Sequence, residues 1–104
     1  MIFIVDIDNT ICKTENSDYL NSVPYPERIA KINKLYEEGH QIIYWTARGG
    51  VSGIDWTDHT RKQLTEWGCK YDEIRMRKPS YDMWIDDKAI NSEVFFDANL
   101  SDWT

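Results

Sequence analysis

Apolar and polar positions alternate in blocks along the chain, and these blocks predict strands and helices in turn. Residues 2–5 form an unbroken apolar run rich in β-branched side chains, which is typical of a strand buried on both faces in a parallel sheet. Residues 41–45 predict a second strand, and residues 71–76 predict a weaker one. We expect a further strand at residues 81–85, and either a last short strand or a packing tail at residues 94–96.

Two segments between these runs carry apolar residues at helical spacing. The first predicted helix starts near Pro26, a residue favoured in the first turn, and ends before Gly39, a residue favoured just after the last turn. The second runs from Thr57 to Trp67. Residues 11–22 are expected to form a loop, with a turn and a small hairpin, over the mouth of the first strand. This order predicts an α/β fold, a three-layer α/β/α sandwich with a mostly parallel, Rossmann-like sheet.

Length and charge narrow the range of functions. The chain has 104 residues, enough for a single domain over residues 1–104. Its net charge of −6 disfavours nucleic acid and anionic membranes as partners, because both bind basic surfaces. No apolar stretch is long enough to cross a bilayer and no signal-peptide pattern is present, so we expect a cytoplasmic protein. Cys12 and Cys69 lack a metal-binding spacing and are expected to be free thiols.

Polar side chains follow the predicted strands at the points where the strands end. Asp6 and Asp8 follow the first strand, Thr46 follows the second, and Asp86 and Asp87 follow the fourth. Because the carboxyl ends of parallel strands meet at one edge of a sheet, we expect these groups to converge. Several carboxylates cannot stay ionised together without a counter-charge, and Mg²⁺, a hard cation that prefers oxygen ligands, would supply it.

Four short segments resemble, in order, the four motifs of the haloacid dehalogenase-like (HAD) phosphatases. They are Asp6-Ile7-Asp8-Asn9-Thr10, Thr46, Lys78 and Asp86-Asp87, and they span nearly the whole chain. Any one of these motifs is common by chance, whereas four in order, at or near predicted strand ends, are specific. The resemblance implies a Mg²⁺-dependent phosphomonoester hydrolase that acts through an aspartyl-phosphate intermediate.

The resemblance also implies a role for each matching residue. Asp6 is the expected nucleophile at phosphorus, and Asp8 is the expected general acid and then the general base. Thr46 and the main-chain amide of Ala47 are expected to bind phosphoryl oxygens, and Lys78 to neutralise the transferring group. The expected Mg²⁺ ligands are the Asp6 carboxylate, the Asp8 carbonyl and the Asp86 carboxylate.

Several of these positions have rival interpretations. Arg75 and Arg77 compete with Lys78 for the cationic role, and we favour Lys78 because a proline follows it, as it often does in the family. Arg48 directly follows the phosphate-binding segment and is predicted to bind substrate, although a surface salt bridge fits its position equally well. Asp87 fits a structural role as well as a functional one.

Two positions depart from the family pattern, which often has glycine at both. Asn9 follows Asp8, and Arg77 precedes Lys78. Asparagine tolerates the left-handed conformation that a tight turn requires, so we expect Asn9 to be harmless. Arg77 is expected to change the shape of its loop or to add a phosphate contact.

The chain has no room for the cap domain that often sets substrate choice in this family. We therefore expect a capless enzyme, which either acts on exposed substrates or closes its pocket with a neighbouring copy in a homo-oligomer. Residues 54–57, 85–91 and 95–96 are similar to short HAD proteins found with bacterial capsule and surface-polysaccharide genes. That similarity implies a small phosphorylated substrate, a sugar phosphate or a sugar-acid phosphate.

Three other functions are alternatives at this point. The first is a nucleotide or nucleic-acid end phosphatase, whose polymer version the negative charge disfavours. The second is a receiver-like signalling module, which also holds Mg²⁺ but carries its phospho-acceptor aspartate at the end of a later strand, whereas Thr46 ends the second strand here. The third is a non-catalytic HAD-like binding protein, which the presence of all four motifs disfavours.

Overall fold

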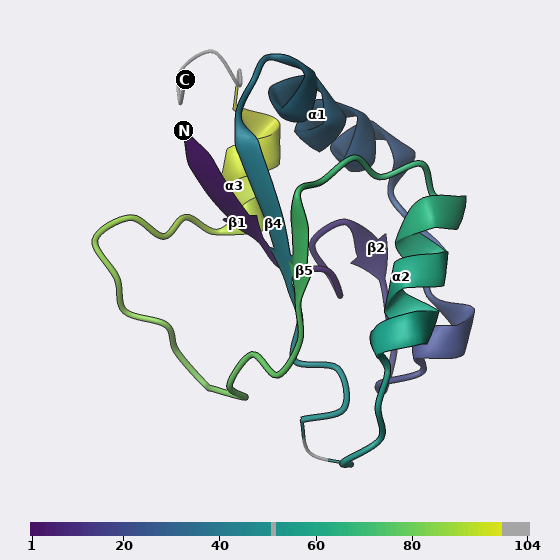
Figure 1. Ribbon diagram of the computed structural model, residues 1–104. Coiled ribbons are helices and arrows are strands. Elements are labelled where there is room, and N and C mark those ends of the chain that lie inside the picture. The colour runs from purple at the N-terminus through teal and green to yellow at the C-terminus, as the bar shows by residue number, and fades with distance from the viewer. Residues whose placement is uncertain (51, 99–104) are drawn as a thin grey trace.

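The computed structural model of this chain describes residues 1–50 and 52–98. It contains a three-stranded parallel sheet, a two-stranded hairpin and helices packed around them (Figure 1). In chain order the elements are β1 (Ile2–Val5), β2 (Cys12–Lys13), the short 3-10 helix η1 (Tyr19–Asn21), β3 (Val23–Pro24), α1 (Pro26–Glu37), β4 (Gln41–Trp45), α2 (Thr57–Glu66), β5 (Glu73–Arg75) and α3 (Ser92–Asp97).

The three-stranded sheet has the order β1-β4-β5, and its strands are parallel. Phe3 lies beside Ile42 and Val5 lies beside Tyr44, which in turn lies beside Ile74. These side chains belong to the hydrophobic core or pack against it. The predicted parallel sheet is therefore confirmed, and the first two predicted strands are β1 and β4 with unchanged bounds.

Three helices contribute to the core on this face of the sheet. Ile32 and Leu35 of α1, Leu64 of α2, and Phe95 and Phe96 of α3 are all buried there. An ion pair and a side-chain to main-chain hydrogen bond join α3 to α1, so these two helices lie side by side. The helices predicted from the apolar spacing are α1 and α2, and burial of their apolar stripes is the main source of their stability.

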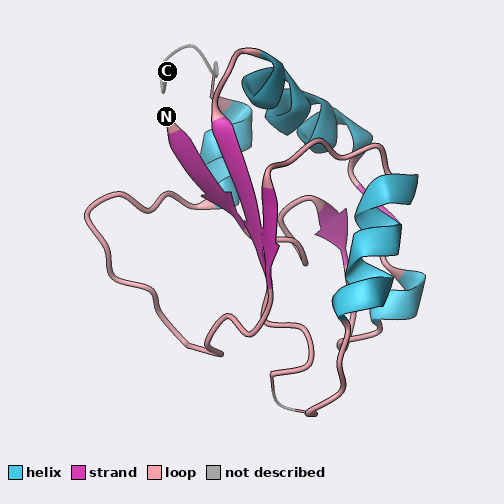
Figure 2. Cartoon of the chain, in the orientation of Figure 1, coloured by secondary structure: helices cyan, strands magenta, loops and turns pink. Residues whose placement is uncertain are grey.

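The opposite face of the sheet carries irregular chain rather than helix in the part of the molecule that the structure describes. On β1, Ile2 and Ile4 point to this face and are 65% and 55% exposed. Residues 76–91 connect β5 to α3 as a long irregular segment that loops away from α1 and α2 (Figure 2). Within this segment Trp84 packs edge-on against Trp45 of β4. The α/β fold with a parallel sheet is thus as predicted, and its outer layer on this face is a loop.

The strand predicted at residues 81–85 is wrong. These residues are irregular, and Met83 and Ile85 are 76% and 89% exposed. Tyr81 and Trp84 pack on each other and lie near the Lys78 ammonium group. The aromatic side chains that suggested a strand therefore make local contacts instead of sheet contacts.

The apolar residues at 94–96 belong to a helix rather than to a last strand. Asn91 caps α3 by accepting a hydrogen bond from the main-chain N–H of Glu93, which satisfies one of the free donors of the first turn. Phe95 and Phe96 then turn inward, and the alternative prediction of a packing tail is the better description.

The predicted hairpin between the first strand and the first helix is confirmed. β2 pairs antiparallel with β3, and the segment between them includes η1. The carbonyl of Tyr19 in η1 accepts a hydrogen bond from Gln63 of α2, so the hairpin tip lies against that helix. No helix within residues 1–50 and 52–98 is long and apolar enough to cross a membrane.

Candidate active site

An open pocket of about 350 Å³ lies where β1 and β4 end and the hairpin begins. It combines residues that follow the two central strands with residues from the hairpin tip. The lining residues are Asp6, Asp8, Asn9, Thr14, Asn16, Ser17, Tyr19, Ala47 and Arg48. The carboxyl edge of a parallel sheet is where ligands bind in open α/β folds, and this pocket occupies that position.

Asp6 and Lys78 face each other beside this pocket. Nζ of Lys78 lies 3.9 Å from Oδ1 of Asp6, and the two side chains are 14% and 38% exposed. Burial raises the pKa of Asp6 above its usual value, and the nearby ammonium group opposes this rise. Of the three candidate cations, Lys78 is the one that approaches Asp6, because Arg75 pairs with Glu73 and Arg77 is exposed.

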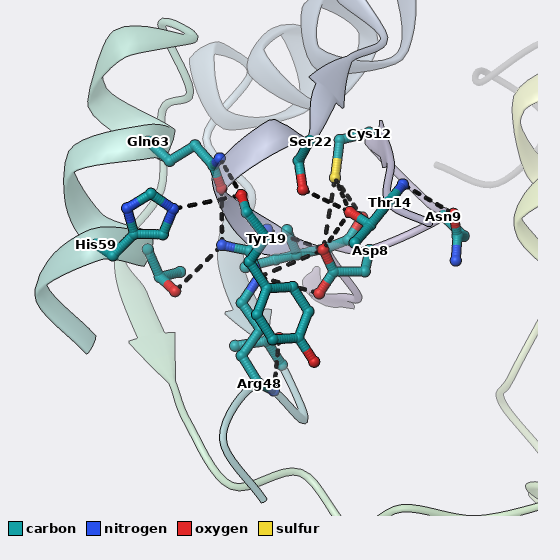
Figure 3. A network of polar contacts seen from close by, with 12 residues as sticks. Asp8, Asn9, Cys12, Thr14, Tyr19, Ser22, Arg48, His59 and Gln63 are labelled. Atoms are coloured by element: carbon teal, nitrogen blue, oxygen red, sulfur yellow. Dashed lines mark hydrogen bonds and ion pairs between the residues drawn. The ribbon is translucent and has the colours of Figure 1, made fainter. Parts of the chain in front are cut away.

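The Asp8 carboxylate is held by donors from two other segments (Figure 3). Nη2 of Arg48 lies 2.8 Å from Oδ1 of Asp8, and Nε of Arg48 lies 3.0 Å from Oδ2. The hydroxyl of Thr14 lies 2.6 Å from Oδ1 as well. Two parallel bonds from a guanidinium fix both the position and the plane of a carboxylate, so Asp8 has a defined orientation at the pocket wall.

Arg48 is buried, contrary to the surface salt bridge that was one expectation for it. Its side chain has no exposed surface, whereas Asp8 is 20% exposed. Nη1 donates to Oε1 of Gln63 at 2.7 Å and to Oγ1 of Thr60 at 3.3 Å, both on α2. The guanidinium carbon lies 4.8 Å from the centre of the Tyr19 ring. At least four of the five guanidinium N–H groups therefore have protein acceptors. Arg48 also belongs to the pocket lining, and the substrate contact predicted for it stays a prediction.

Thr46 and Ala47 lie at the end of β4, as predicted. Thr46 is fully buried, and its hydroxyl oxygen accepts a hydrogen bond from the main-chain N–H of Arg48 at 3.2 Å. Its main-chain carbonyl accepts a bond from the N–H of Lys78, which fixes the turn that brings the lysine to Asp6. Ala47 is partly exposed in the pocket wall.

Asp86 is not gathered with the other acidic residues of the predicted site. It lies in the exposed irregular segment, where it accepts bonds from the Trp84 indole N–H and the Lys88 main-chain N–H. Within the described residues, no three His, Cys, Asp or Glu side chains form a group that could hold a metal. The irregular course of residues 81–85 explains this, because the predicted strand would have delivered Asp86 to the sheet edge.

The remaining donors still fit a hard divalent cation. Asp6 is a partly buried carboxylate whose neighbour Asp8 adds a second negative charge, and Lys78 approaches it only to 3.9 Å. Mg²⁺ is commonly bound through one or two carboxylates together with substrate phosphate oxygens and waters, so a full protein cage is not required. The Asp6 carboxylate and the Asp8 carbonyl match this donor type.

Two turns of the site are left-handed at residues where the family pattern often has glycine. Asn9 has φ 61° and Arg77 has φ 61°. The side chain of Asn9 also accepts a hydrogen bond from the main-chain N–H of Thr14, so asparagine both tolerates the turn and ties it to the hairpin. Arg77 is exposed and strained, and it shapes the turn that delivers Lys78.

Replacing Arg77 by glycine is expected to stabilise the fold. A left-handed non-glycine residue costs about 1–2 kcal/mol, and the larger entropy loss of glycine offsets about 0.5–1 kcal/mol of the relief. We therefore expect the free energy of unfolding to rise by about 0.5 kcal/mol in urea titrations. Gly68→Ala, at φ 73°, is the matched control and should lower the unfolding midpoint. A lower midpoint for Arg77→Gly would contradict this description of the turn.

Several residues of the site were not singled out from the sequence. Thr14 and Tyr19 come from the hairpin, a segment that was expected to cover the strand mouth without individual assignments. Thr60 and Gln63 are polar residues on the inward stripe of α2, one turn apart. The sequence signal that could have indicated Gln63 is a polar residue on the helix stripe expected to face the core, because such a side chain needs a hydrogen-bond partner.

This chain is similar to two solved structures. No protein-family model matches the chain, and no curated protein matches it. A structural-genomics crystal structure from Vibrio cholerae is 28% identical, with a TM-score of 0.84, over 97% of this chain and 91% of that one. The chain is therefore similar to that protein along nearly its whole length.

A second similar solved structure is that of an enzyme. It is D,D-heptose 1.7-bisphosphate phosphatase from B. bronchiseptica, complexed with magnesium and phosphate. It is 19% identical with a TM-score of 0.54, and the match covers 72% of this chain and 48% of that one. At this identity the likeness shows a shared α/β fold.

Proposed function

We propose that this protein is a Mg²⁺-dependent phosphomonoester hydrolase of the HAD type. The observation that carries the proposal is the placement of Asp6 between Lys78, at 3.9 Å, and Asp8, at the edge of an open pocket at the carboxyl end of the parallel sheet. A nucleophile, a cation and an acid–base group then surround the place that a phosphoryl group would occupy. The structural likeness to a phosphatase complexed with magnesium and phosphate supports the same conclusion.

The proposed reaction proceeds in two displacements. In the first, a carboxylate oxygen of Asp6 forms a bond to phosphorus while the bond to the leaving oxygen breaks, and the Asp8 carboxyl gives its proton to that oxygen. In the second, Asp8 takes a proton from water, the water oxygen bonds to phosphorus, and the bond to Asp6 breaks. Phosphate leaves, and Asp6 is regenerated. Lys78, the Thr46 hydroxyl and the Ala47 amide are proposed to stabilise charge on the phosphoryl oxygens.

The proposed metal ligands are the Asp6 carboxylate and the Asp8 carbonyl, with substrate phosphate oxygens and waters completing the coordination. Bound Mg²⁺ would neutralise charge on the phosphoryl group and on Asp6. Asp86, which the sequence predicted as a third ligand, lies in the exposed connection between β5 and α3 and is not grouped with these two residues.

The proposed substrate is a small sugar phosphate or sugar-acid phosphate of surface-polysaccharide synthesis. The pocket is open, and polar hairpin residues, including Asn16 and Ser17, line it together with Asp6 and Asp8. Such side chains suit the hydroxyl groups of a sugar better than an apolar leaving group. A homo-oligomer is compatible with the exposed apolar side chains Ile2 and Ile4.

The experiment that tests this function is a Mg²⁺-dependent phosphate-release screen. It covers sugar phosphates, nucleotides, end-phosphorylated oligonucleotides and p-nitrophenyl phosphate, each with Mg²⁺ and with excess chelator. We expect Mg²⁺-dependent release that is fastest with sugar phosphates. Faster release from nucleotides would favour the nucleotide phosphatase instead, and no release from any of these compounds would overturn the phosphatase assignment.

Lys78→Met is expected to lower turnover strongly while leaving the fold intact. Removing one preorganised positive group beside the reacting atoms typically costs about 10²–10³-fold in kcat. Lys88→Met, an exposed lysine in the same irregular segment, should leave kcat unchanged. Steady-state rates with the best substrate of the screen measure both. A Lys78→Met enzyme with wild-type kcat would remove this lysine from the reaction.

A further inference from the structure

We infer that Arg48 is a positioning residue for Asp8, and that α2 takes part in acid–base catalysis through it. The inference rests on the proposed phosphatase function and concerns how its acid–base group is held. The observation that carries it is a buried guanidinium that bridges Asp8 on one side to Gln63 on the other (Figure 3). The same guanidinium also donates to the Thr60 hydroxyl.

The geometry on the Asp8 side leaves the carboxylate little freedom. Nε and Nη2 of Arg48 lie 3.0 and 2.8 Å from its two oxygens, and the Thr14 hydroxyl adds a third bond. A carboxylate held this way keeps one plane, and proton transfer to a leaving oxygen depends on that plane and on reach. A displacement of about 1 Å in such a group can cost on the order of 10²-fold in rate.

On the side away from Asp8, contacts with α2 and the hairpin tip fix the position of the Arg48 guanidinium. Oε1 of Gln63 accepts from Nη1 at 2.7 Å, while Nε2 of the same amide donates to the Tyr19 carbonyl at 2.9 Å. The Tyr19 ring lies beside the guanidinium, with 4.8 Å from its centre to the guanidinium carbon. Arg48 is thus held between α2 and the hairpin tip, and the hairpin tip lines the pocket.

Burial of Arg48 argues for this role and against a direct substrate contact. A guanidinium with no exposed side-chain surface is costly to desolvate, and it is retained where its donors are matched by fixed acceptors. Lysine carries the same charge but offers a single donor centre, so it cannot hold Asp8 and Gln63 at once.

The test uses two aryl phosphates that differ in their need for a general acid. p-Nitrophenolate leaves without a proton, whereas phenolate leaves much more easily when protonated. The comparison of kcat/KM for phenyl phosphate and p-nitrophenyl phosphate reports the first displacement only. For Arg48→Met we expect kcat/KM to fall about 10²-fold with phenyl phosphate and less than about tenfold with p-nitrophenyl phosphate.

Two further variants separate orientation from charge and from folding. Arg48→Lys should show the same unequal loss, because charge alone does not orient Asp8. Gln63→Met removes the Gln63 side-chain carbonyl that accepts from Arg48. It should also lower kcat/KM more for phenyl phosphate than for p-nitrophenyl phosphate, by a smaller factor. This variant decides the test if the Arg48 variants do not fold. Arg61→Met, an exposed arginine of α2 paired with Asp58, is the control and should change neither rate.

The outcomes distinguish this inference from the function on which it rests. If folded Arg48→Met loses both activities equally or neither, or if Arg48→Lys restores both, the positioning role is overturned while the phosphatase remains. If Gln63→Met decides the test and shows equal losses, the positioning role is overturned in the same way. If Asp6→Asn retains hydrolysis of both esters, the phosphatase mechanism itself is overturned.

Discussion

Replacing Asp6 by asparagine is expected to abolish Mg²⁺-dependent phosphate release. An amide cannot form the aspartyl-phosphate, and loss of a nucleophile typically costs on the order of 10⁴-fold or more. The substitution preserves side-chain size, so the fold around Lys78 should persist. Burial of Asp6 raises its pKa, which shows that the site disfavours a charge there, so a neutral amide should not weaken the fold.

The control for this experiment is Asp97→Asn, an exposed acid in α3. Its phosphate release should equal that of the wild type. Rates are measured with the best substrate of the screen after far-UV circular dichroism confirms both folds. Substantial turnover by Asp6→Asn would exclude this residue as the nucleophile.

Asp8→Asn has the second largest expected effect, and unlike Asp6→Asn it should leave the first displacement possible with a good leaving group. Losing a general acid–base group typically costs about 10²–10⁴-fold, because the leaving oxygen and the attacking water both lose their proton partner. The first displacement should survive with p-nitrophenyl phosphate, whose leaving group needs no proton. We therefore expect a burst of p-nitrophenol followed by slow turnover, measured by stopped-flow absorbance.

The matched control is Asp82→Asn, in the exposed segment between β5 and α3. It should show wild-type turnover. A wild-type steady-state rate for Asp8→Asn would contradict the acid–base role. Slow turnover without any burst would mean that the loss of Asp8 slows the first displacement itself, even with a leaving group that needs no proton.

The parts of the fold that the sequence predicted are those with local signals. The runs at residues 2–5 and 41–45 predicted their strands correctly, because β-branched and aromatic residues favour a strand. The burial of both faces that the first run suggested is wrong, since Ile2 and Ile4 are exposed. Pro26 and Gly39 mark α1 by backbone preference alone. The location of Asp6 and Asp8 could then be predicted from the chain direction, since residues that follow a parallel strand lie at the ligand-binding edge of the sheet.

The features that the sequence did not predict depend on contacts between segments that are distant in the chain. The pattern at residues 81–85 is compatible with a strand, but Trp84 packs against Trp45 and Lys78, and the segment does not pair with a neighbouring strand. The burial of Arg48 could not be predicted from the sequence either, because charged residues are usually exposed. Its burial depends on Asp8 and Gln63, which are distant in sequence and both contact it. Tertiary partners, rather than local propensity, decide both cases.

The central claim is that Asp6 becomes covalently phosphorylated during turnover, and quench–mass spectrometry tests it most directly. Asp8→Asn enzyme is mixed with p-nitrophenyl phosphate and Mg²⁺, quenched in acid and digested, and the peptide that carries Asp6 is sequenced by mass spectrometry. The account predicts a phosphoryl group on the Asp6 side chain that requires Mg²⁺ and is absent from Asp6→Asn enzyme. A burst of p-nitrophenol with no phosphoryl group on Asp6, or with the group on another residue, would contradict it.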